Sequence, residues 1–505
     1  MGVIEDKLCR GMEKVLGITT VDINDNFIRL GGNTVLAGKL VNECNLEGLD
    51  SQIVMMGLTP LDIGRILKEK GNRKPEFSVD KTDNDEYPMT PSMLYNFFCC
   101  EATNKTIDVT DLKGLWELND DIDLDRLKKA IVNLLENYPG LNIGFNREKK
   151  TFIKRNCLKP DIQILDLSEA SFKEQIFKLG SKQRDLMNDD MIDVSIMKTP
   201  TKSYLYMRIP HLVYDGASLN SFFEGITKCY KNEKPANEAA TIFDEGNHQR
   251  KIIESGFFDE AITYYDNIYK DYPIDLRKNM KDDYSTYFMN EKIGKISKLE
   301  YKSFLRKEGL TFGILLQAAF VLALSSELKA ERFSYRVFHS GRYDDRVKNL
   351  QGTEARPILM IANINKDQAV VDFLKHLQYR YYETIYYDVV PMTTIIKKYP
   401  DLDSGIIFNY RGSLLGSTDI ILDGKTNSFS VLGYILGSTS KEDGHSHDII
   451  DFMIDKQNDD FLISGNSGYY SNEKVFEIAE KMKIAFDSLI ENDSVGQVLN
   501  ILDNY

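Results

Sequence analysis

The sequence predicts a small all-α helical bundle followed by a larger, two-lobed α/β (α+β) domain. Three observations indicate this fold class. Residues 1–72 repeat their apolar positions at helical spacing, residues 73–86 are polar and aperiodic, and helix-like and strand-like segments alternate from residue 87 onward. A chain of 505 residues has room for about three folding units. Because one hydrophobic core rarely serves more than about 250–300 residues, we expect two lobes, at residues 87–260 and 261–505.

The first 72 residues have the pattern of consecutive short helices. The apolar positions of the first helix are Ile4, Leu8, Met12, Val15 and Leu16. A second helix is expected over 34–44, where the side-chain oxygen of Asn33 can cap the free backbone amides. A third, over 59–67, begins with Thr-Pro, and proline is tolerated in a first helical turn. Residues 73–86 then have the polar composition of a linker.

The segments after the linker justify the two-layer α/β interpretation. Residues 203–209 alternate Tyr204, Tyr206 and Arg208 with Leu205, Met207 and Ile209, as a strand does. Residues 405–410 are also strand-like. Helical patterns occur over 124–135, 222–230, 312–324 and 473–490.

Composition excludes several classes of protein. The net charge of −14 argues against general nucleic-acid binding, which needs basic surface to displace counterions. The longest apolar run, 312–324, is interrupted by Gln317 and is shorter than the ~20 residues of a membrane span, so we expect a buried helix. Six cysteines without a C-x-x-C pair favour reduced thiols in a cytoplasmic protein. The histidines form no metal-binding pattern, and we expect no metal.

The first candidate site is the segment Gly31-Gly32-Asn33-Thr34. The two glycines permit a tight turn, and the Thr34 hydroxyl stands at a helix N-terminus, where backbone amides favour a phosphate. On these residues alone, a simple turn before a helix is an equally good interpretation.

Residues 25–34, Asp-Asn-Phe-Ile-Arg-Leu-Gly-Gly-Asn-Thr, resemble the D-x-F-F-x-L-G-G-x-S segment of the peptidyl carrier domains of nonribosomal peptide synthetases. The resemblance covers residues 1–72 and implies a four-helix bundle whose serine carries 4′-phosphopantetheine, attached by a phosphopantetheinyl transferase. Here Thr34 takes the serine position. Its β-methyl group crowds the oxygen, so slow loading, an unloaded structural carrier and an altered residue all stay open.

The second candidate site is the segment from His211 to Gly216, which follows one strand-like run and precedes a helix. A histidine leaving a strand can offer a neutral, basic imidazole to a cleft near pH 7. Asp215 can orient the loop, and Gly216 permits a sharp turn. A histidine in a turn capped by an aspartate is the structural alternative.

The segment is similar to the His-His-x-x-x-Asp-Gly motif of the condensation superfamily, which is related to chloramphenicol acetyltransferase. His211 takes the place of the second, functional histidine, and Pro210 replaces the first. The resemblance implies that Asp215 is structural and pairs with a distant arginine, for which Arg342 in His-Ser-Gly-Arg is the candidate. Three further segments resemble family segments in the right order, at 87–92, 137–145 and 387–391.

Three functions follow from these resemblances. The first is condensation, in which a carrier-bound aminoacyl amine attacks a carrier-bound acyl or peptidyl thioester, with His211 as base or amine-positioning group. The second is epimerisation, favoured by the Phe-Asn-Tyr of residues 408–410 but disfavoured because Phe338 takes the place of the expected catalytic glutamate. The third is a degenerate, non-catalytic docking didomain, indicated by Thr34 and Pro210. We rank condensation first.

The resemblance also implies the partners. Upstream and downstream carrier and adenylation domains of one assembly line would supply and receive the substrates. The chain begins and ends near domain edges, so we expect a piece of a larger synthetase.

Overall fold

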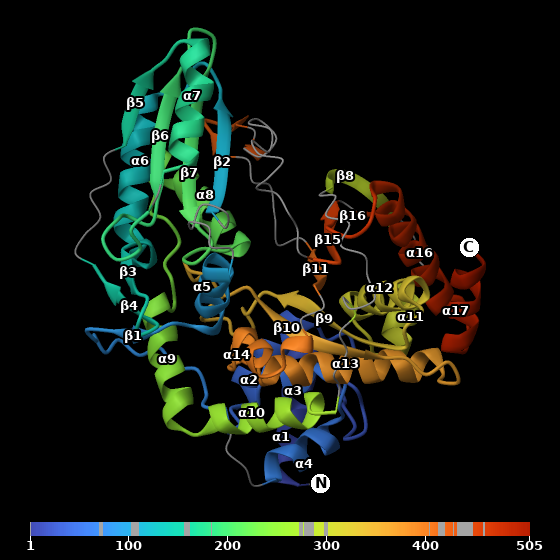
Figure 1. The fold of residues 1–505 in the computed structure, drawn as a ribbon. Coiled ribbons are helices and arrows are strands. Elements are labelled where there is room, and N and C mark those ends of the chain that lie inside the picture. The colour runs from blue at the N-terminus through green and yellow to red at the C-terminus, as the bar shows by residue number, and fades with distance from the viewer. Residues whose placement is uncertain are drawn as a thin grey trace.

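The computed structural model describes residues 2–69, 74–102, 111–155, 162–182, 184–271, 276, 287–296, 301–402, 405–412, 420–427, 429–431, 448–457 and 460–505. Figure 1 shows an N-terminal group of helices at the base of the molecule, one lobe rising beside it, and a second lobe that carries the C-terminus. The two-lobed α/β architecture expected after residue 86 is confirmed.

Four helices make up the N-terminal unit (residues 1–72): α1 (Val3–Leu16), α2 (Thr34–Cys44), α3 (Ser51–Met55) and α4 (Pro60–Lys68). Local chemistry fixes where they begin. The Asn33 side chain accepts a hydrogen bond from the Leu36 amide at 3.0 Å, as expected from the sequence. Thr59 and Asp62 form a reciprocal capping box at the start of α4.

The linker follows helix α9 (Ile242–Glu254) as an extended strap. The Asp80 carboxylate forms an ion pair with Lys251 at 2.8 Å, and the Asp80 amide donates a hydrogen bond to Asp244 at 2.9 Å. Asn84 donates to Asn247 at 2.8 Å. The linker is therefore attached to α9 along most of its described length, although its polar, aperiodic sequence is typical of a free tether.

The N-lobe is built on a five-stranded sheet in the order β14-β2-β7-β6-β5, with a small β1-β4-β3 sheet beside it. All neighbours in the larger sheet are antiparallel except β5 and β6. The strands are β1 (Tyr87–Pro88), β2 (Asp111–Leu118), β3 (Ile143–Asn146), β4 (Thr151–Lys154), β5 (Gln163–Asp166), β6 (Asp193–Lys198) and β7 (Ser203–Pro210). The helices are α5 (Pro91–Ala102), α6 (Leu124–Asn137), α7 (Glu169–Gly180) and α8 (Gly216–Tyr230).

The alternation of β7 explains the layers of this lobe. Leu205 and Met207 belong to the core that α6 and α8 cover. Tyr204 and Tyr206 belong to the smaller cluster under α7. Successive strand residues face opposite sides of the sheet, so different helices cover its two faces. The strand expected over 203–209 is confirmed.

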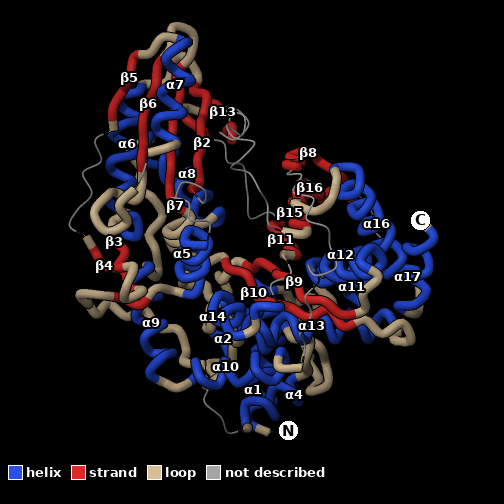
Figure 2. The backbone as a smooth tube through the Cα atoms, in the orientation of Figure 1, coloured by secondary structure: helices blue, strands red, loops and turns tan. Residues whose placement is uncertain are grey.

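The C-lobe is built on a six-stranded sheet in the order β10-β9-β11-β15-β16-β8 (Figure 2). Strand β11 runs parallel to both neighbours, and the other pairs are antiparallel. The strands are β8 (Tyr287–Ile296), β9 (Arg332–His339), β10 (Arg356–Asn363), β11 (Ile406–Gly412), β15 (Ile450–Gln457) and β16 (Asp460–Ser467). The helices are α11 (Tyr301–Glu308), α12 (Phe312–Leu328), α13 (Val370–Tyr386), α14 (Met392–Lys398), α16 (Asn472–Glu491) and α17 (Val495–Asn504).

The chain crosses between the lobes more than once. Helix α10 (Phe257–Tyr269) runs through the expected lobe border at 260/261 without a break. After β11 the chain returns to the N-lobe, where β12 (Ile420–Leu422) pairs with β13 (Lys425–Asn427) and β14 (Phe429–Val431) pairs with β2. The N-lobe sheet is therefore completed by residues that lie more than 200 positions beyond the rest of it.

Helix α12 is the buried helix expected from the apolar run at 312–324. Its buried residues extend without interruption from Ile314 to Ser326, and Gln317 donates to the Tyr335 hydroxyl at 2.8 Å. In the described part of the chain no single helix has the length and apolar composition of a membrane span; one pair, α11 with α12, has them only when joined and is bent by 105°.

Candidate active site between the two lobes

His211 lies in the turn that joins β7 to α8. The neighbouring Leu212, Val213 and Tyr214 are fully buried in the N-lobe core and anchor this turn. The Val213 amide donates to the Pro210 carbonyl at 2.9 Å. His211 itself is half-buried, and its Nδ1 has no hydrogen-bond partner among the described residues. The turn therefore fixes the backbone of His211 and leaves its Nδ1 buried without a hydrogen-bond partner in the described part of the chain.

Asp215 and Arg342 form the buried ion pair that the sequence led us to expect. One guanidinium nitrogen of Arg342 lies 3.0 and 3.2 Å from the two Asp215 carboxylate oxygens, and the side chains are 5% and 1% exposed. The amides of Glu354 and Ala355 also donate to Asp215, at 2.8 and 3.1 Å. Asp215 thus links the start of α8 to a C-lobe segment.

Electrostatics keep this pair charged. Burial raises the pKa of Asp215, but Arg342 and the amides of Glu354, Ser218 and Ala355 lower it further, so the pKa lies below its usual value. Arg342 is held in turn by Ser218 and by the carbonyls of Val347, Leu350 and Gly352, at 2.7–3.1 Å. Arg342 Nε is buried without a hydrogen-bond partner among the described residues. The other contacts hold Asp215 and Arg342 in place, which indicates a structural role for the pair.

A cavity of about 910 Å³ lies between the lobes and extends to the N-terminal unit. We call it the interlobe cavity. Its lining combines Thr34 and Val35 of α2, Ala217, Asn220, Ser221 and Glu224 of α8, Phe312 and Gln317 of α12, Phe338 and His339 of β9, Arg342, Tyr381 and Tyr382 of α13, and Phe408 and Tyr410 of β11. His211 is not part of this lining, although Ala217, in the first turn of the helix after it, is.

Thr34 is the first residue of α2 and stands exposed where the interlobe cavity reaches the N-terminal unit. The glycines before it are required by the backbone. Gly31 has φ +104°, and a Cβ on Gly32 would lie 2.3 Å from the Phe27 ring. The Gly-Gly-Asn-Thr segment therefore turns the chain sharply and presents the Thr34 hydroxyl at a helix N-terminus beside the cavity.

The N-terminal unit is packed tightly against the C-lobe. Its apolar residues share one continuous core with α12, α13 and α16. The Ser51 hydroxyl donates to the Tyr343 carbonyl at 3.4 Å, and a Cβ on Gly38 would lie 3.2 Å from the same oxygen. A Cβ on Gly309 would lie 2.9 Å from the Asn26 side chain. The contact is thus close enough to exclude added methyl groups.

A buried charged network beside Arg342 was not found from the sequence. Arg356 donates to Asp388 at 3.0 and 2.7 Å, and His339 Nε2 lies 3.3 Å from the same carboxylate. The Gly341 amide donates to His339 Nδ1 at 3.2 Å, and burial lowers the pKa of His339 to about 3. His339 Nδ1 therefore accepts a hydrogen bond, whereas its Nε2 lies near Asp388 without a hydrogen-bond partner among the described residues. Through Nδ1, this neutral histidine positions the Gly341–Arg342 turn. The available signal was Asp388, which lies in the segment 387–391.

The fold and the site define a class of protein: a two-lobed α/β protein of the chloramphenicol acetyltransferase type, with a histidine turn, a buried Asp–Arg pair behind it and a cavity between the lobes. The family model described as "Condensation domain" matches residues 111–497. The chain belongs to the condensation domain family. The match leaves the N-terminal unit outside, so its carrier identity stays a prediction.

Curated relatives are distant and much longer. Gramicidin S synthase 2 of Brevibacillus brevis is 20% identical over 408 residues, which cover 78% of this chain and 9% of the relative. Surfactin synthase subunit 2 of Bacillus subtilis (strain 168) is 20% identical over 74% of this chain and 11% of the relative. The chain thus spans about a tenth of the length of these relatives.

Solved structures share the fold at low sequence identity. The X-domain from teicoplanin biosynthesis aligns over 83% of this chain and 98% of its own, with a TM-score of 0.62 and 13% identity. The first condensation domain of the calcium-dependent antibiotic synthetase aligns over 82% and 99%, with a TM-score of 0.60 and 10% identity. The epimerization domain from the third module of tyrocidine synthetase B aligns over 85% and 100%, with a TM-score of 0.58 and 16% identity.

Proposed function

We propose that the chain is part of a nonribosomal peptide synthetase, in which residues 1–72 act as a carrier domain and the two lobes form an amide bond between carrier-bound substrates. The observation that supports this proposal is the position of Thr34. The residue at the family's attachment point is exposed and lines a cavity of about 910 Å³ that continues between the lobes. A substrate attached there would enter the cavity directly.

The surroundings of Thr34 fit a 4′-phosphopantetheine arm. The hydroxyl is exposed, it stands at a helix N-terminus that favours a phosphate, and the adjacent cavity has room for an extended chain. When attached, the arm would supply the thiol that holds the acyl group as a thioester. The arm's attachment is slowed by the β-methyl group of threonine, which crowds the attacking oxygen.

The chain's own residues contribute positioning and a base. The lobes and the docked N-terminal unit bring two tethered substrates together, which lowers the entropic part of the barrier. His211 holds the acceptor amine and takes its proton, a contribution of roughly 10²–10⁴-fold. Asp215 and Arg342 keep the turn that carries His211 against the C-lobe.

A direct test loads donor and acceptor carriers and compares the wild-type chain with His211→Ala. We expect amide formation to fall at least 100-fold in His211→Ala. His376→Ala, an exposed histidine on α13, is the matched control and should keep full activity. Equal activity of wild type and His211→Ala would overturn the catalytic role of His211. Loss of α-carbon configuration without amide formation would indicate epimerisation instead.

The carrier role has its own test. The wild-type chain and Thr34→Ser are incubated with coenzyme A and a phosphopantetheinyl transferase and weighed by mass spectrometry. We expect Thr34→Ser to gain one phosphopantetheine rapidly and the wild type to gain it slowly or not at all. Absence of any gain in Thr34→Ser would refute the carrier assignment.

A non-catalytic docking role is the second candidate, and two observations favour it. Pro210 replaces the first motif histidine, and His211 does not line the interlobe cavity. The X-domain with the same fold has been solved in a complex with OxyB from teicoplanin biosynthesis. This candidate predicts no amide and no epimerised product under any loading condition.

A further inference from the structure

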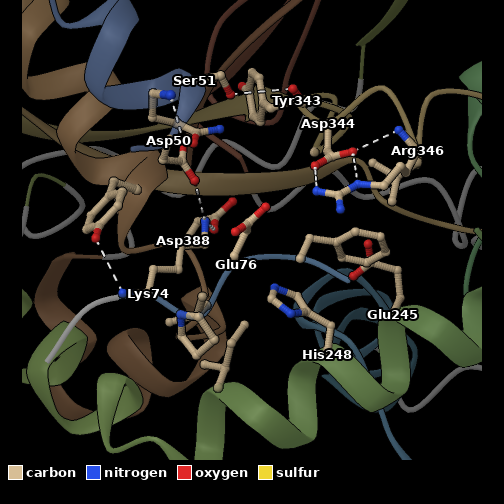
Figure 3. A pocket seen from close by; sticks show the side chains of 18 of the residues that line it. Asp50, Ser51, Lys74, Glu76, Glu245, His248, Tyr343, Asp344, Arg346 and Asp388 are labelled. Carbon is tan, nitrogen blue, oxygen red and sulfur yellow. Dashed lines mark hydrogen bonds and ion pairs between the residues drawn. The ribbon is translucent and has the colours of Figure 1, made fainter. Parts of the chain in front are cut away.

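A second cavity lies where the N-terminal unit, the linker and the two lobes meet, and we call it the junction cavity. Its volume is about 130 Å³. Figure 3 shows its lining: Asp50 and Ser51 at the start of α3, Lys74 and Glu76 of the linker, Glu245 and His248 of α9, and Tyr343, Asp344, Arg346 and Asp388 of the C-lobe. It shares Tyr343–Asp345 with the interlobe cavity but contains neither Thr34 nor any residue of α8.

Acidic side chains outnumber basic ones on the lining of the junction cavity. Seven carboxylates line it, from Asp50, Glu76, Glu245, Asp344, Asp345, Glu354 and Asp388. Three side-chain cations oppose them, from Lys74, Arg346 and Arg356. Burial lowers the pKa of His248 to about 3, so its imidazole is neutral and adds no positive charge. The lining therefore holds four more carboxyl groups than cationic side chains.

The three cations are already engaged. Arg356 pairs with Asp388 at 2.7 Å, and Arg346 pairs with Asp344. The Lys74 ammonium lies between two carboxylates, 3.8 Å from Asp50 and 3.9 Å from Asp388. Within the described part of the chain, the carboxylates of Glu76, Glu245 and Asp345 have neither an ion pair nor a hydrogen bond. Glu76 and Asp345 are exposed to water, whereas Glu245 is half-buried, so Glu245 is the one of the three that faces the cavity with little solvent.

Two deeply buried polar atoms on the lining also lack a hydrogen-bond partner among the residues that the structure describes. Glu354 is 3% exposed, and its Oε1 accepts no hydrogen bond. His248 is 7% exposed, and its Nδ1 makes none either. Figure 3 shows the His248 ring rising from α9 into the space between the linker and the C-lobe. Because burying a polar atom without a hydrogen-bond partner is unfavourable, these atoms indicate a missing hydrogen-bond partner.

The pKa directions agree with a missing positive charge. Burial raises the pKa of Glu245 and of Glu354, and the partial opposition of Arg356 does not restore either value. A bound cation would favour the ionised form of both groups.

The volume of the junction cavity and the residues that form its wall indicate which chemical class of ligand it fits. The volume approaches the ~150 Å³ of a cavity that holds benzene, which is far more than one bare ion needs. No group of three or more His, Cys, Asp or Glu among the described residues is arranged to hold a metal ion. Aromatic rings of Phe77, Tyr343 and Tyr386 form part of the wall. Ring faces attract ammonium groups, and Lys74 already lies 5.7 Å from the Tyr386 ring centroid.

We propose that the junction cavity binds a small organic ammonium cation, a primary amine or diamine about the size of benzene. Its ammonium group donates to Glu354 Oε1 and to the Glu245 carboxylate, and its aliphatic part lies against the aromatic rings. Because the lining comes from the N-terminal unit, the linker and both lobes, the bound amine fastens the four together. The site is independent of amide formation at the interlobe cavity.

The test uses the full chain and isothermal titration calorimetry with 1,4-diaminobutane. We expect saturable one-to-one binding and a higher thermal unfolding midpoint, with no response to butanol, which has the same carbon chain and no charge. Glu354→Gln and Glu245→Gln should each weaken binding at least tenfold. Glu148→Gln, an exposed glutamate far along the chain from the lining, is the matched control and should bind like the wild type.

Several outcomes would overturn the proposal. One is the absence of saturation by 1,4-diaminobutane in the wild-type chain, and another is undiminished binding in both glutamine variants. Saturation by MgCl₂ at matched ionic strength, without saturation by the diamine, would define a metal site instead. Should the buried variants fail to fold, Glu76→Gln, at an exposed linker position, removes one unpaired charge, and a wild-type affinity in it counts against the site.

Discussion

At the scale of single residues, the proposed catalytic side chain, His211, differs from its neighbours Asp215 and Arg342, which are held by several contacts. Among the described residues, Nδ1 of His211 has no hydrogen-bond partner, whereas Nδ1 of His339 accepts a hydrogen bond from the Gly341 amide. Asp215 and Arg342 are held by each other and by protein backbone groups. The sequence motif suggested this division, and the contacts of Asp215 give it a physical basis. The choice of His211 comes from the resemblance and stays a prediction. The contact between His339 and Asp388 was not predictable, because Asp388 lies 49 positions further along the chain.

Arg342→Met should destabilise the chain by about 3–5 kcal/mol, because it leaves the Asp215 charge buried with only backbone donors. Urea unfolding measures the change. Asp215→Asn combined with Arg342→Met should cost less than the sum of the two single changes, since they share one interaction. Arg10→Met, at an exposed ion pair on α1, is the control and should change stability by less than ~0.5 kcal/mol. A similarly small loss in Arg342→Met would contradict a structural role.

Asp451 of β15 should make stability depend on pH. Burial and the nearby Asp448 raise its pKa to about 7, and its buried Oδ1 has no hydrogen-bond partner. The folded protein therefore keeps a proton that the unfolded chain releases near pH 4, so the contribution of Asp451 to stability falls as pH rises from about 4 to about 7.

Asp451→Asn removes this slope. At pH 8 the variant should be more stable than the wild type by roughly 1–3 kcal/mol, and near pH 4 the two should be equal. Chemical denaturation at a series of pH values measures the difference. Glu148→Gln should show a difference that does not change with pH, and a flat difference for Asp451→Asn as well would mean that the carboxyl is not perturbed.

At the scale of elements, local periodicity predicted where helices begin, whereas polar composition did not predict how the linker is attached. The helices expected over 34–44, 124–135 and 473–490 begin within one residue of the observed ones, because amphipathic spacing and N-caps are local signals. The linker looked like a free tether because it has no apolar period. Its attachment depends on polar partners such as Asp244 and Asn247, more than 160 positions away, and no local pattern reports such partners.

The linker residue Lys74 should hold the N-terminal unit in place. Its ammonium bridges Asp50 of that unit and Asp388 of the C-lobe, and its amide donates to the Tyr386 hydroxyl at 3.4 Å. We expect Lys74→Gln to speed amide hydrogen exchange in α2 and α3 several-fold while leaving α16 unchanged. Lys234→Gln, at an exposed loop position, should leave all three helices at wild-type rates. Unchanged exchange in α2 and α3 of Lys74→Gln would show that the apolar contact alone holds the unit.

At the scale of the whole molecule, the fold class was predictable and the connection between lobes was not. Chain length and alternating patterns indicated two lobes. The return of β14 to the N-lobe rests on three residues, Phe429–Val431, that pair with β2. A three-residue strand carries too little pattern to be assigned a partner more than 300 positions away. The predicted border at 260/261 also differs from the structure, because it falls inside helix α10.

Asn427 should secure the returning segment to the N-lobe. It is fully buried, its Oδ1 accepts from the Asn119 amide at 2.8 Å, and its Nδ2 donates to the Ile420 carbonyl at 3.0 Å. Asn427→Ala leaves these backbone groups unsatisfied, at a cost of about 2–3 kcal/mol.

The fluorescence of Trp116 reports this change directly, because it is the chain's one tryptophan and pairs with Phe429 of β14. The midpoint of denaturation followed by Trp116 should fall in Asn427→Ala. Asn504→Ala, at the exposed end of α17, should keep the wild-type midpoint. An unchanged midpoint in Asn427→Ala would show that β12–β14 are held by apolar packing alone.

The return of residues 420–431 to the N-lobe affects what recombination between two related genes can produce. A single crossover near residue 260 joins the N-lobe of one parent to a C-terminal half that still supplies the other parent's β14. The hybrid sheet then pairs β2 and β14 from different ancestors, and side chains such as Asn119 and Asn427 meet partners they were not selected with. A chimera that preserves both lobes needs two further junctions, flanking residues 420–431, so that the inherited unit is a discontinuous piece of sequence.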